Sequence, residues 1–254
     1  MTRLVSGVAL GAAALAAILF LPAMVLRVLA CGVAALAAHE YLTVTQSKTS
    51  LPVLALVAAG CWLVPEWRGD LALRLMMFLA AWVALTVLWR GTSLQDAGVQ
   101  AFAPLYIGLP LGMLLAVHMQ TGARVTLLLI GTVVVSDSAQ YYTGRMFGRH
   151  PLAPTISPKK TREGALGGVL FGTLFMVGIG RLFLGAPVAT LALLGALIVA
   201  AGICGDLFES RLKRASGVKD SSSIIPGHGG VLDRIDALLF AAPVFYFYLQ
   251  AARP

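Results

Sequence analysis

The sequence has few charged residues for its length. Aspartate, glutamate, lysine and arginine make up 12% of its 254 residues, whereas hydrophobic residues make up 59%. Soluble domains carry roughly 25% charged residues, about twice this share. The shortage of charge therefore excludes an ordinary soluble enzyme, and the lack of polar low-complexity sequence excludes a disordered chain. The composition predicts an integral membrane protein.

Two common kinds of site are missing. The three cysteines, Cys31, Cys61 and Cys204, are odd in number, far apart and set in apolar runs. This arrangement excludes a disulfide framework and a zinc site, and it predicts buried free thiols. No segment matches the GxxxxGK[ST] pattern of soluble phosphate-binding loops, so any phosphate site must be built differently.

Apolar stretches of about the length of a membrane span fill most of the chain. They cover residues 4–21, 23–38, 51–64, 71–89, 101–119, 125–142, 164–184, 186–205 and 231–249. Pro104 and Pro110 predict a kink in the fifth stretch. The predicted fold is an all-α polytopic membrane helix bundle of about nine transmembrane helices with a cytoplasm-facing polar active-site cavity. Residues 1–120 are expected to form a scaffold of transmembrane helices, and residues 121–254 a catalytic domain with cytoplasmic loops 145–163 and 206–230.

Basic residues are concentrated in two polar segments. Ten of the nineteen lysines and arginines fall within 145–163 and 206–234. Short basic loops remain in the cytoplasm, so the pattern predicts a cytoplasmic N-terminus and an active site on the cytoplasmic face. A packing role, in which glycines allow helices to approach closely in lipid, is supported as strongly as a functional role for Gly164, Gly167, Gly168 and Gly172.

Acidic residues at the ends of the apolar stretches predict a cation site. Asp137 lies near the end of the sixth stretch, where an ionisable residue indicates function by default. Asp206, Glu209 and Lys213 share one helix face, and Asp233 and Asp236 repeat that spacing. Several carboxylates beside a phosphate site suit Mg²⁺. The alternative for Asp233 and Asp236 is simple charge complementarity with a helix N-terminus, worth about 0.3–1 kcal/mol.

Phosphate-binding groups are predicted in the same polar segments. Lysine and arginine bind phosphate as a point charge and as a bidentate fork. In PGHGG, the glycines around His228 allow the backbone to approach a phosphate closely. The backbone N–H groups at the N-terminus of the following helix can also bind an anion. The alternative is a basic cytoplasmic loop with no ligand. The basic candidates of the first segment are Arg145, Arg149, Lys159, Lys160 and Arg162.

Residues 210–236, SRLKRASGVKDSSSIIPGHGGVLDRID, resemble the signature of the phosphatidate cytidylyltransferase (CDP-diacylglycerol synthase) family. The matching positions are Ser210, Leu212, Lys213, Arg214, Lys219, Asp220, Ser222, Ile225, Pro226, His228, Gly229, Gly230, Asp233, Arg234 and Asp236. The upstream segment SDSAQYYTGRMFGRHPLAPTISPKKTREG resembles a second block of that family. Gln140 stands where a small residue is usual, and Arg162 where tryptophan is usual. The resemblance covers about residues 131–250.

The resemblance implies transfer of CMP from CTP to phosphatidic acid, giving CDP-diacylglycerol and pyrophosphate. It implies Mg²⁺ with K⁺ beside it, a homodimer in the bilayer, and no nucleic-acid partner. The implied metal ligands are Asp206, Asp233 and Asp236. The implied phosphate-binding residues are Ser157, Lys159, Lys160, Lys213, Arg214, Lys219 and Arg234. The implied catalytic set is Asp137, Asp206, Lys213, Arg214, Lys219, Asp220, His228, Asp233, Arg234 and Asp236.

Two alternatives remain open at this point. One is a cytidylyltransferase or kinase that acts on another lipid phosphate. The other is a transporter of phosphorylated solutes, in which acidic residues within the membrane and basic mouths also occur. Release of pyrophosphate would separate the enzymes from the transporter.

Overall fold

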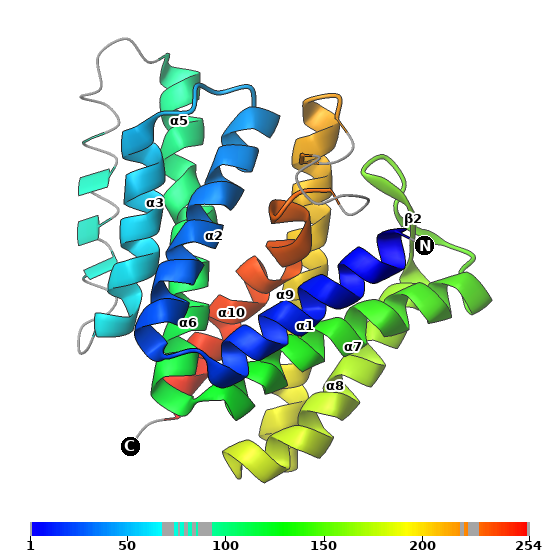
Figure 1. Ribbon diagram of the computed structural model, residues 1–254. Coiled ribbons are helices and arrows are strands. Elements are labelled where there is room, and N and C mark those ends of the chain that lie inside the picture. The colour runs from blue at the N-terminus through cyan, green and yellow to red at the C-terminus, as the bar shows by residue number, and fades with distance from the viewer. Residues whose placement is uncertain are drawn as a thin grey trace. The chain divides into compact units, whose positions relative to one another are not determined.

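The computed structural model describes residues 2–67, 74, 75, 77, 78, 81, 82, 85, 93–218, 221, 222 and 229–252, and these are largely helical (Figure 1). Four helical stretches in this part of the chain are long and apolar enough to cross a membrane. They are Ala23–Val44, Leu94–Thr121, Arg162–Leu184 and Val188–Ala215. The prediction of an all-α membrane protein is confirmed at this level. Most of the predicted fourth span, 71–89, lies outside the described residues.

The chain divides into two compact units. The first combines residues 1–116 with 220–232, and the second combines 117–219 with 233–254. The segment 220–232, which carries PGHGG, is therefore grouped with N-terminal residues that are far from it in the sequence. The two units are described separately below.

The first unit is built from apolar helices. It contains α1 (Thr2–Phe20), α2 (Ala23–Val44), α3 (Leu51–Leu63), the 3-10 turn η1 (Val64–Glu66), α5 (Leu94–Ala103), the π-helical turn η2 (Pro104–Gly108) and most of α6 (Leu109–Thr121). Helices α2 and α3 pack side by side, and η2 packs on both. Close packing at η2 depends on Gly108, where an added Cβ would lie 2.6 Å from the Val57 carbonyl oxygen.

The structure has a π-helical turn at the first of the two prolines for which a kink was predicted. Proline has no backbone N–H to continue the hydrogen-bond ladder, and such sites are often accommodated by a π-turn. Here the π-helical turn begins at Pro104, and the Leu109 N–H donates to the Pro104 carbonyl. At Pro110 the helix continues, so Leu94–Thr121 is helical throughout.

The second unit contains a hairpin between its helices. After the end of α6 come α7 (Ala123–Phe147), β1 (Pro151–Ala153), β2 (Ser157–Thr161), α8 (Arg162–Leu184), α9 (Val188–Ala215) and α10 (Leu232–Ala251). The strands are antiparallel, with Pro151 opposite Thr161 and Ala153 opposite Ser157. The predicted loop 145–163 is thus largely structured, and Thr161 caps α8 by accepting from the Gly164 N–H at 3.1 Å.

Helix α9 is longer than its apolar stretch. The predicted span ended at Gly205, but the helix continues to Ala215, so the predicted loop 206–230 is wrong for residues 206–215. Hydropathy marks where the apolar part of a helix ends, not where the helix itself ends. The polar extension is stabilised by the Glu209–Lys213 pair at i,i+4 spacing.

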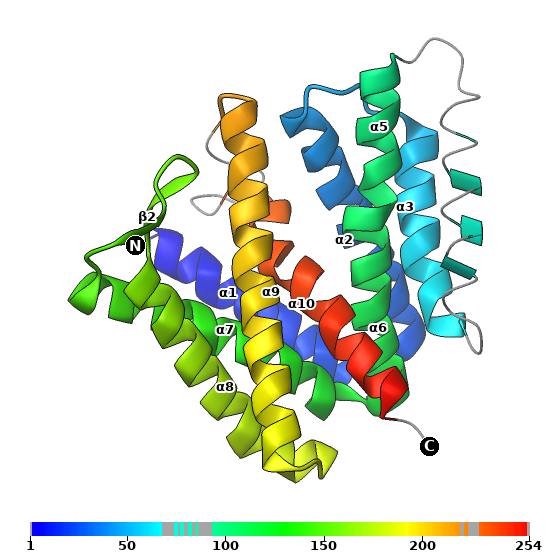
Figure 2. The same cartoon turned by 180° about the vertical axis from the view of Figure 1, so that it is seen from behind.

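Helices α7 and α8 run side by side in both views (Figures 1 and 2). Gly164, Gly167, Gly168 and Gly172 are all buried. An added Cβ at Gly164 would lie 2.8 Å from the Gln140 carbonyl oxygen, and one at Gly172 would lie 2.5 Å from Cγ2 of Val199. The packing interpretation of these glycines is therefore confirmed.

The cysteines are free thiols, as predicted, but only one is fully buried. Cys61 is buried in α3, and Cys31 is half-buried and donates to the Ala58 carbonyl at 3.4 Å. Cys204 is exposed on α9, so its predicted burial is wrong.

Candidate active site

The second unit brings acids from three helices together. Asp137 lies in α7, Asp206 in α9, and Asp236 in the second turn of α10. The charges of Asp206 and Asp236 both act on the Asp137 carboxyl, and the charge of Asp206 acts on Asp236. Acids that are far apart in the sequence thus share one electrostatic environment, as the cation-site prediction requires.

Gly205 allows α9 and α10 to approach closely beside these acids. An added Cβ at Gly205 would lie 2.5 Å from the Asp236 carbonyl oxygen and 3.0 Å from Cδ2 of Phe240. One turn earlier, a Cβ at Gly202 would meet the Cβ of Ala237 at 3.6 Å, an ordinary contact. The close approach is therefore confined to the turn that carries Asp206 on one helix and Asp236 on the other.

Lys213 joins two of the acids. Its Nζ donates to Oδ1 of Asp233 at 2.5 Å and to Oε2 of Glu209 at 3.0 Å. The Glu209 side chain is only 2% exposed and that of Asp233 only 7%. A buried carboxylate is costly without a cationic partner, so Lys213 balances the charge of these two acids.

Glu209 is the functional candidate that the predicted site set omitted. The sequence placed it on the same helix face as Asp206 and Lys213, but the resemblance did not include it. In the structure it is electrostatically linked to both Asp233 and Asp236, and it shares the ammonium of Lys213. The signal that could have identified it was the i,i+4 spacing to Lys213 in the polar extension of α9.

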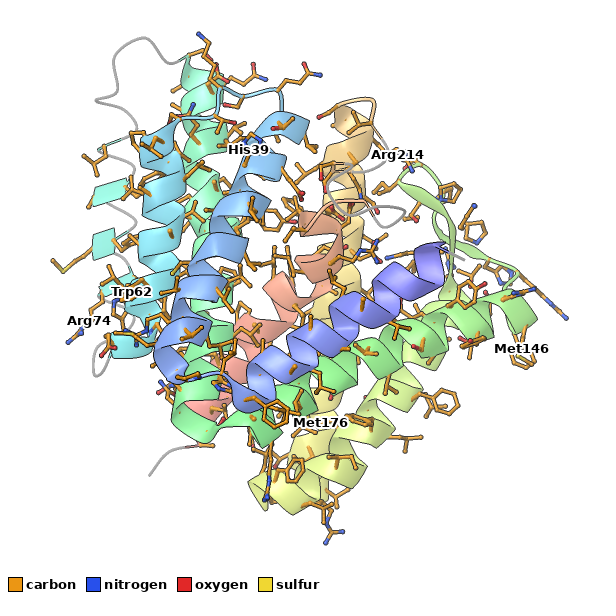
Figure 3. The ribbon with its side chains drawn as sticks, in the orientation of Figure 1. His39, Trp62, Arg74, Met146, Met176 and Arg214 are labelled. Carbon is orange, nitrogen blue, oxygen red and sulfur yellow. The ribbon has the colours of Figure 1, made fainter. Side chains whose placement is uncertain are left out.

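The two hairpin lysines occupy different places. Side chains of a strand alternate between its faces, so Lys159 and Lys160 point in opposite directions. Lys159 is exposed, whereas Lys160 forms an ion pair with Asp206 of α9. Only Lys160 therefore belongs to the acid cluster. Arg214, at the C-terminal end of α9 (Figure 3), donates to the Ile156 carbonyl of the hairpin turn at 3.5 Å.

These positions predict different kinetics for the two lysines. Lys160→Met removes the cationic partner of Asp206, and we expect kcat to fall about 10- to 100-fold, because charge placement at the reacting groups is lost. Lys159→Met should instead raise the KM for a phosphate-bearing substrate with kcat changed less than about 3-fold, as expected for a contact that is equally strong in the ground state and the transition state. Steady-state kinetics of both variants would contradict this placement if their kcat values fell alike.

Gln140 contacts the catalytic candidate Asp137 directly. Its Nε2 donates to Oδ1 of Asp137 at 3.0 Å and to Oγ of Ser136 at 3.2 Å. Its Cγ packs where a Cβ at Gly168 would stand. The larger residue at this position therefore orients Asp137. Arg162 is exposed at the first position of α8.

The remaining predicted residues are spread more widely. Ser157 begins β2 and is half-buried, and Arg234 is exposed on the first turn of α10. Lys219, Asp220 and His228 lie outside the described residues. The structure thus groups Asp137, Lys160, Asp206, Lys213, Asp233 and Asp236 in the second unit.

The donor set fits a hard cation only in part. Carboxylate oxygens are the ligands that Mg²⁺ prefers. Among the residues that the structure describes, however, no three His, Cys, Asp or Glu side chains are placed to hold a metal ion. Lys160 and Lys213 occupy carboxylate oxygens of Asp206 and Asp233. This arrangement suits an ion that is bound by one or two carboxylates together with the phosphates of a substrate.

The chain is similar to a known protein family along most of its length, and to individual proteins over shorter stretches. A family model described as the cytidylyltransferase family matches residues 1–252. The chain is 44% identical over 140 residues to an Escherichia coli protein named uncharacterized protein YnbB, covering 54% of this chain and 46% of that protein. It is 47% identical over 125 residues to the phosphatidate cytidylyltransferase of Aquifex aeolicus, covering 49% and 47%.

A third relative is matched over more of its length. The phosphatidate cytidylyltransferase of Helicobacter pylori is 36% identical over 216 residues, covering 83% of this chain and 77% of that protein. The matched stretch spans about half the length of the first two relatives and about three quarters of this one.

Proposed function

The chain belongs to the cytidylyltransferase family, and from this premise we propose that it is a phosphatidate cytidylyltransferase of phospholipid biosynthesis. It transfers CMP from CTP to phosphatidic acid and gives CDP-diacylglycerol and pyrophosphate. Two of the relatives carry the name of this activity. The observation that carries the proposal is the group of acids Asp137, Asp206, Asp233 and Asp236, in which Lys160 pairs with Asp206 and Lys213 with Asp233.

The reaction is an in-line displacement at the α-phosphorus of CTP. An oxygen of the lipid phosphate forms a bond to that phosphorus as the bond to the bridging oxygen of the β-phosphate breaks, and pyrophosphate leaves with the bonding electrons. The lipid phosphate is already ionised, so no strong general base is needed. Positioning and charge neutralisation therefore provide most of the rate enhancement.

The residues divide into acids that would bind cations and bases that would contact phosphates. Asp206 and Asp233, with Asp236 beside them, would hold Mg²⁺, which neutralises the phosphate charge when bound; K⁺ beside it is part of the same proposal. Lys160 and Lys213 pair with these acids and can turn to the phosphates when the cation takes their place. Ser157, Lys159, Arg214, Lys219 and Arg234 are the further phosphate contacts. Asp220 and His228 complete the proposed site.

The membrane arrangement follows from charge. A polar active-site cavity that faces the cytoplasm of a bacterial inner membrane is supported by the basic segments 145–163 and 206–234. A bundle of about nine spans and a homodimer are part of the proposal. The hydrophobic surface of α8, which includes exposed Leu166, Leu170 and Leu174, suits contact with lipid.

Purified protein in liposomes of defined lipid would test the proposal. CTP, Mg²⁺ and either phosphatidic acid, a polyprenyl phosphate or an ether-lipid phosphate would be supplied, and CDP-lipid and pyrophosphate would be quantified together. We expect both products in equal amounts, with phosphatidic acid turned over fastest and no product after removal of Mg²⁺ with a chelator. Preference for another lipid phosphate would overturn the substrate assignment, and the absence of product with every lipid would overturn the enzyme.

A further inference from the structure

A buried glutamate of the first unit binds the segment that carries the signature. Glu40, in α2, is 1% exposed. Within the part of the chain that the structure describes, its carboxylate accepts four hydrogen bonds: from Oγ of Ser221 at 3.1 Å, Oγ of Ser222 at 2.6 Å, the Val231 N–H at 3.0 Å and the Leu232 N–H at 2.8 Å. A buried charge is costly unless it is hydrogen-bonded in this way.

The four donors come from the two ends of one short segment. Ser221 and Ser222 begin it, and Val231 and Leu232 end it, so one carboxylate ties the two ends together. Each oxygen receives one hydroxyl and one backbone N–H. Leu232 is the first residue of α10, so the negative charge also lies at a helix N-terminus, where it is favoured.

The contact between Glu40 and Ser221 leaves no room for a side chain at Gly230. An added Cβ there would collide with Oγ of Ser221 and with Oε2 of Glu40. The glycine preceding it, Gly229, has a φ of 78°, in the left-handed region that favours glycine. The missing side chain of Gly230 therefore makes room for Glu40, and the phosphate contact predicted for the glycines around His228 stays a prediction.

We propose that Glu40 is a positioning residue for the transferase reaction, acting through the segment 221–232 that it closes. In the sequence the anchored residues bracket His228 and directly adjoin Asp220 and Asp233, three members of the proposed site. Misplacement of reacting groups by about 1 Å can cost about 100-fold in rate, so an anchor at both ends has kinetic consequences. This inference rests on the proposed function for its kinetic part only.

Glu40→Gln changes the chemistry with almost no change in shape. An amide has one accepting oxygen, and its NH₂ group can only donate. In either orientation the NH₂ would face the N–H of Val231 or Leu232, and that hydrogen bond would be lost. Glu40→Asp keeps both accepting oxygens on a side chain that is shorter by one methylene, so it should restore part of the anchor.

The matched control is Glu66→Gln. Oε1 of Glu66 accepts from NH2 of Arg27 at 2.5 Å, so the control also removes the charge of a carboxylate that contacts α2, but one that does not involve residues 221–232. Ser222→Ala is a milder variant that removes one of the four hydrogen bonds. It remains informative if Glu40→Gln fails to fold.

Two readouts would be measured in lipid nanodiscs: amide hydrogen exchange of residues 229–232, and kcat and KM for CTP and phosphatidic acid. For Glu40→Gln we expect exchange to accelerate at least about 10-fold and kcat to fall about 10- to 100-fold with a smaller change in KM. The exchange rates and kcat values of Glu40→Asp and Ser222→Ala should lie between those of this variant and wild type. For Glu66→Gln, the exchange rate and kcat should stay within about 2-fold of wild type.

The two proposals fail in different ways. If wild type makes no CDP-lipid, the proposed function fails, while hydrogen exchange still tests the anchor. If exchange accelerates in Glu40→Gln but kcat is unchanged, Glu40 is only structural and the inference is overturned. Unchanged exchange in both Glu40→Gln and Ser222→Ala would overturn the anchor itself.

Discussion

Replacing Asp233 with asparagine should lower CDP-lipid formation by about 100- to 1,000-fold, while the protein still inserts and extracts like wild type. The Asp233 side chain is 7% exposed, and its Oδ1 accepts from Lys213 at 2.5 Å. Asparagine keeps the shape but removes the negative charge that would bind a cation and that balances Lys213. Initial rates at saturating CTP and Mg²⁺ would measure the loss.

Asp96→Asn is the control for this substitution. Asp96 is a half-buried acid in the first turn of α5, where its Oδ2 accepts from Oγ of Ser93. The same change of chemistry there should leave the rate within about 2-fold of wild type, because Asp96 makes no part of the proposed site. Loss of Asp233→Asn from the membrane fraction, or equal rates in the two variants, would contradict a catalytic role for Asp233.

Gly205→Ala should reduce the rate by about 100-fold, because it separates α9 from α10 beside the acids. The new Cβ would lie 2.5 Å from the Asp236 carbonyl oxygen, a distance that the backbone can relieve only by moving. The movement would displace Asp236 from Asp206. The same assay with quantified, membrane-inserted protein would measure the effect.

Gly202→Ala makes the same change one turn away. Its Cβ would meet the Cβ of Ala237 at 3.6 Å, so we expect a rate within about 2-fold of wild type. Equal losses at Gly202 and Gly205 would show that the rate responds to helix propensity and not to the spacing of the acids.

The sequence predicts well what depends on hydrophobic runs. The apolar stretches identify the cores of α1, α2, α3 and α7 to α10 within a few residues. The ends are less predictable where a helix leaves the membrane: α2 continues six residues past Ala38, and α9 ten residues past Gly205. Polar residues stop a hydropathy run without stopping a helix.

The acids were predictable because ionisable residues are rare in this chain. Asp137, Asp206, Asp233 and Asp236 stand out against apolar surroundings, and the structure groups Asp137, Asp206 and Asp236 electrostatically. The opposite orientations of Lys159 and Lys160 could not be predicted from the sequence. The hairpin of 151–161 lies in a proline-rich segment without the alternation of apolar and polar residues that indicates a strand.

Glu40 could not be predicted from the sequence. Its partners follow it by 181 to 192 positions, and a single glutamate after an apolar run looks like the polar end of a span. Only the fold brings α2 and residues 221–232 together within the first unit. Long-range contacts of this kind depend on packing, which local patterns do not encode.

The central claim is that the chain transfers the α-phosphoryl group of CTP with its cytidine. The most direct measurement supplies liposomes containing phosphatidic acid with CTP labelled either at the α- or at the γ-phosphate. Label from the α-phosphate should enter the lipid and label from the γ-phosphate should appear only in pyrophosphate, with both transfers lost in Asp233→Asn. Entry of the γ-label into the lipid would identify a kinase and contradict the account.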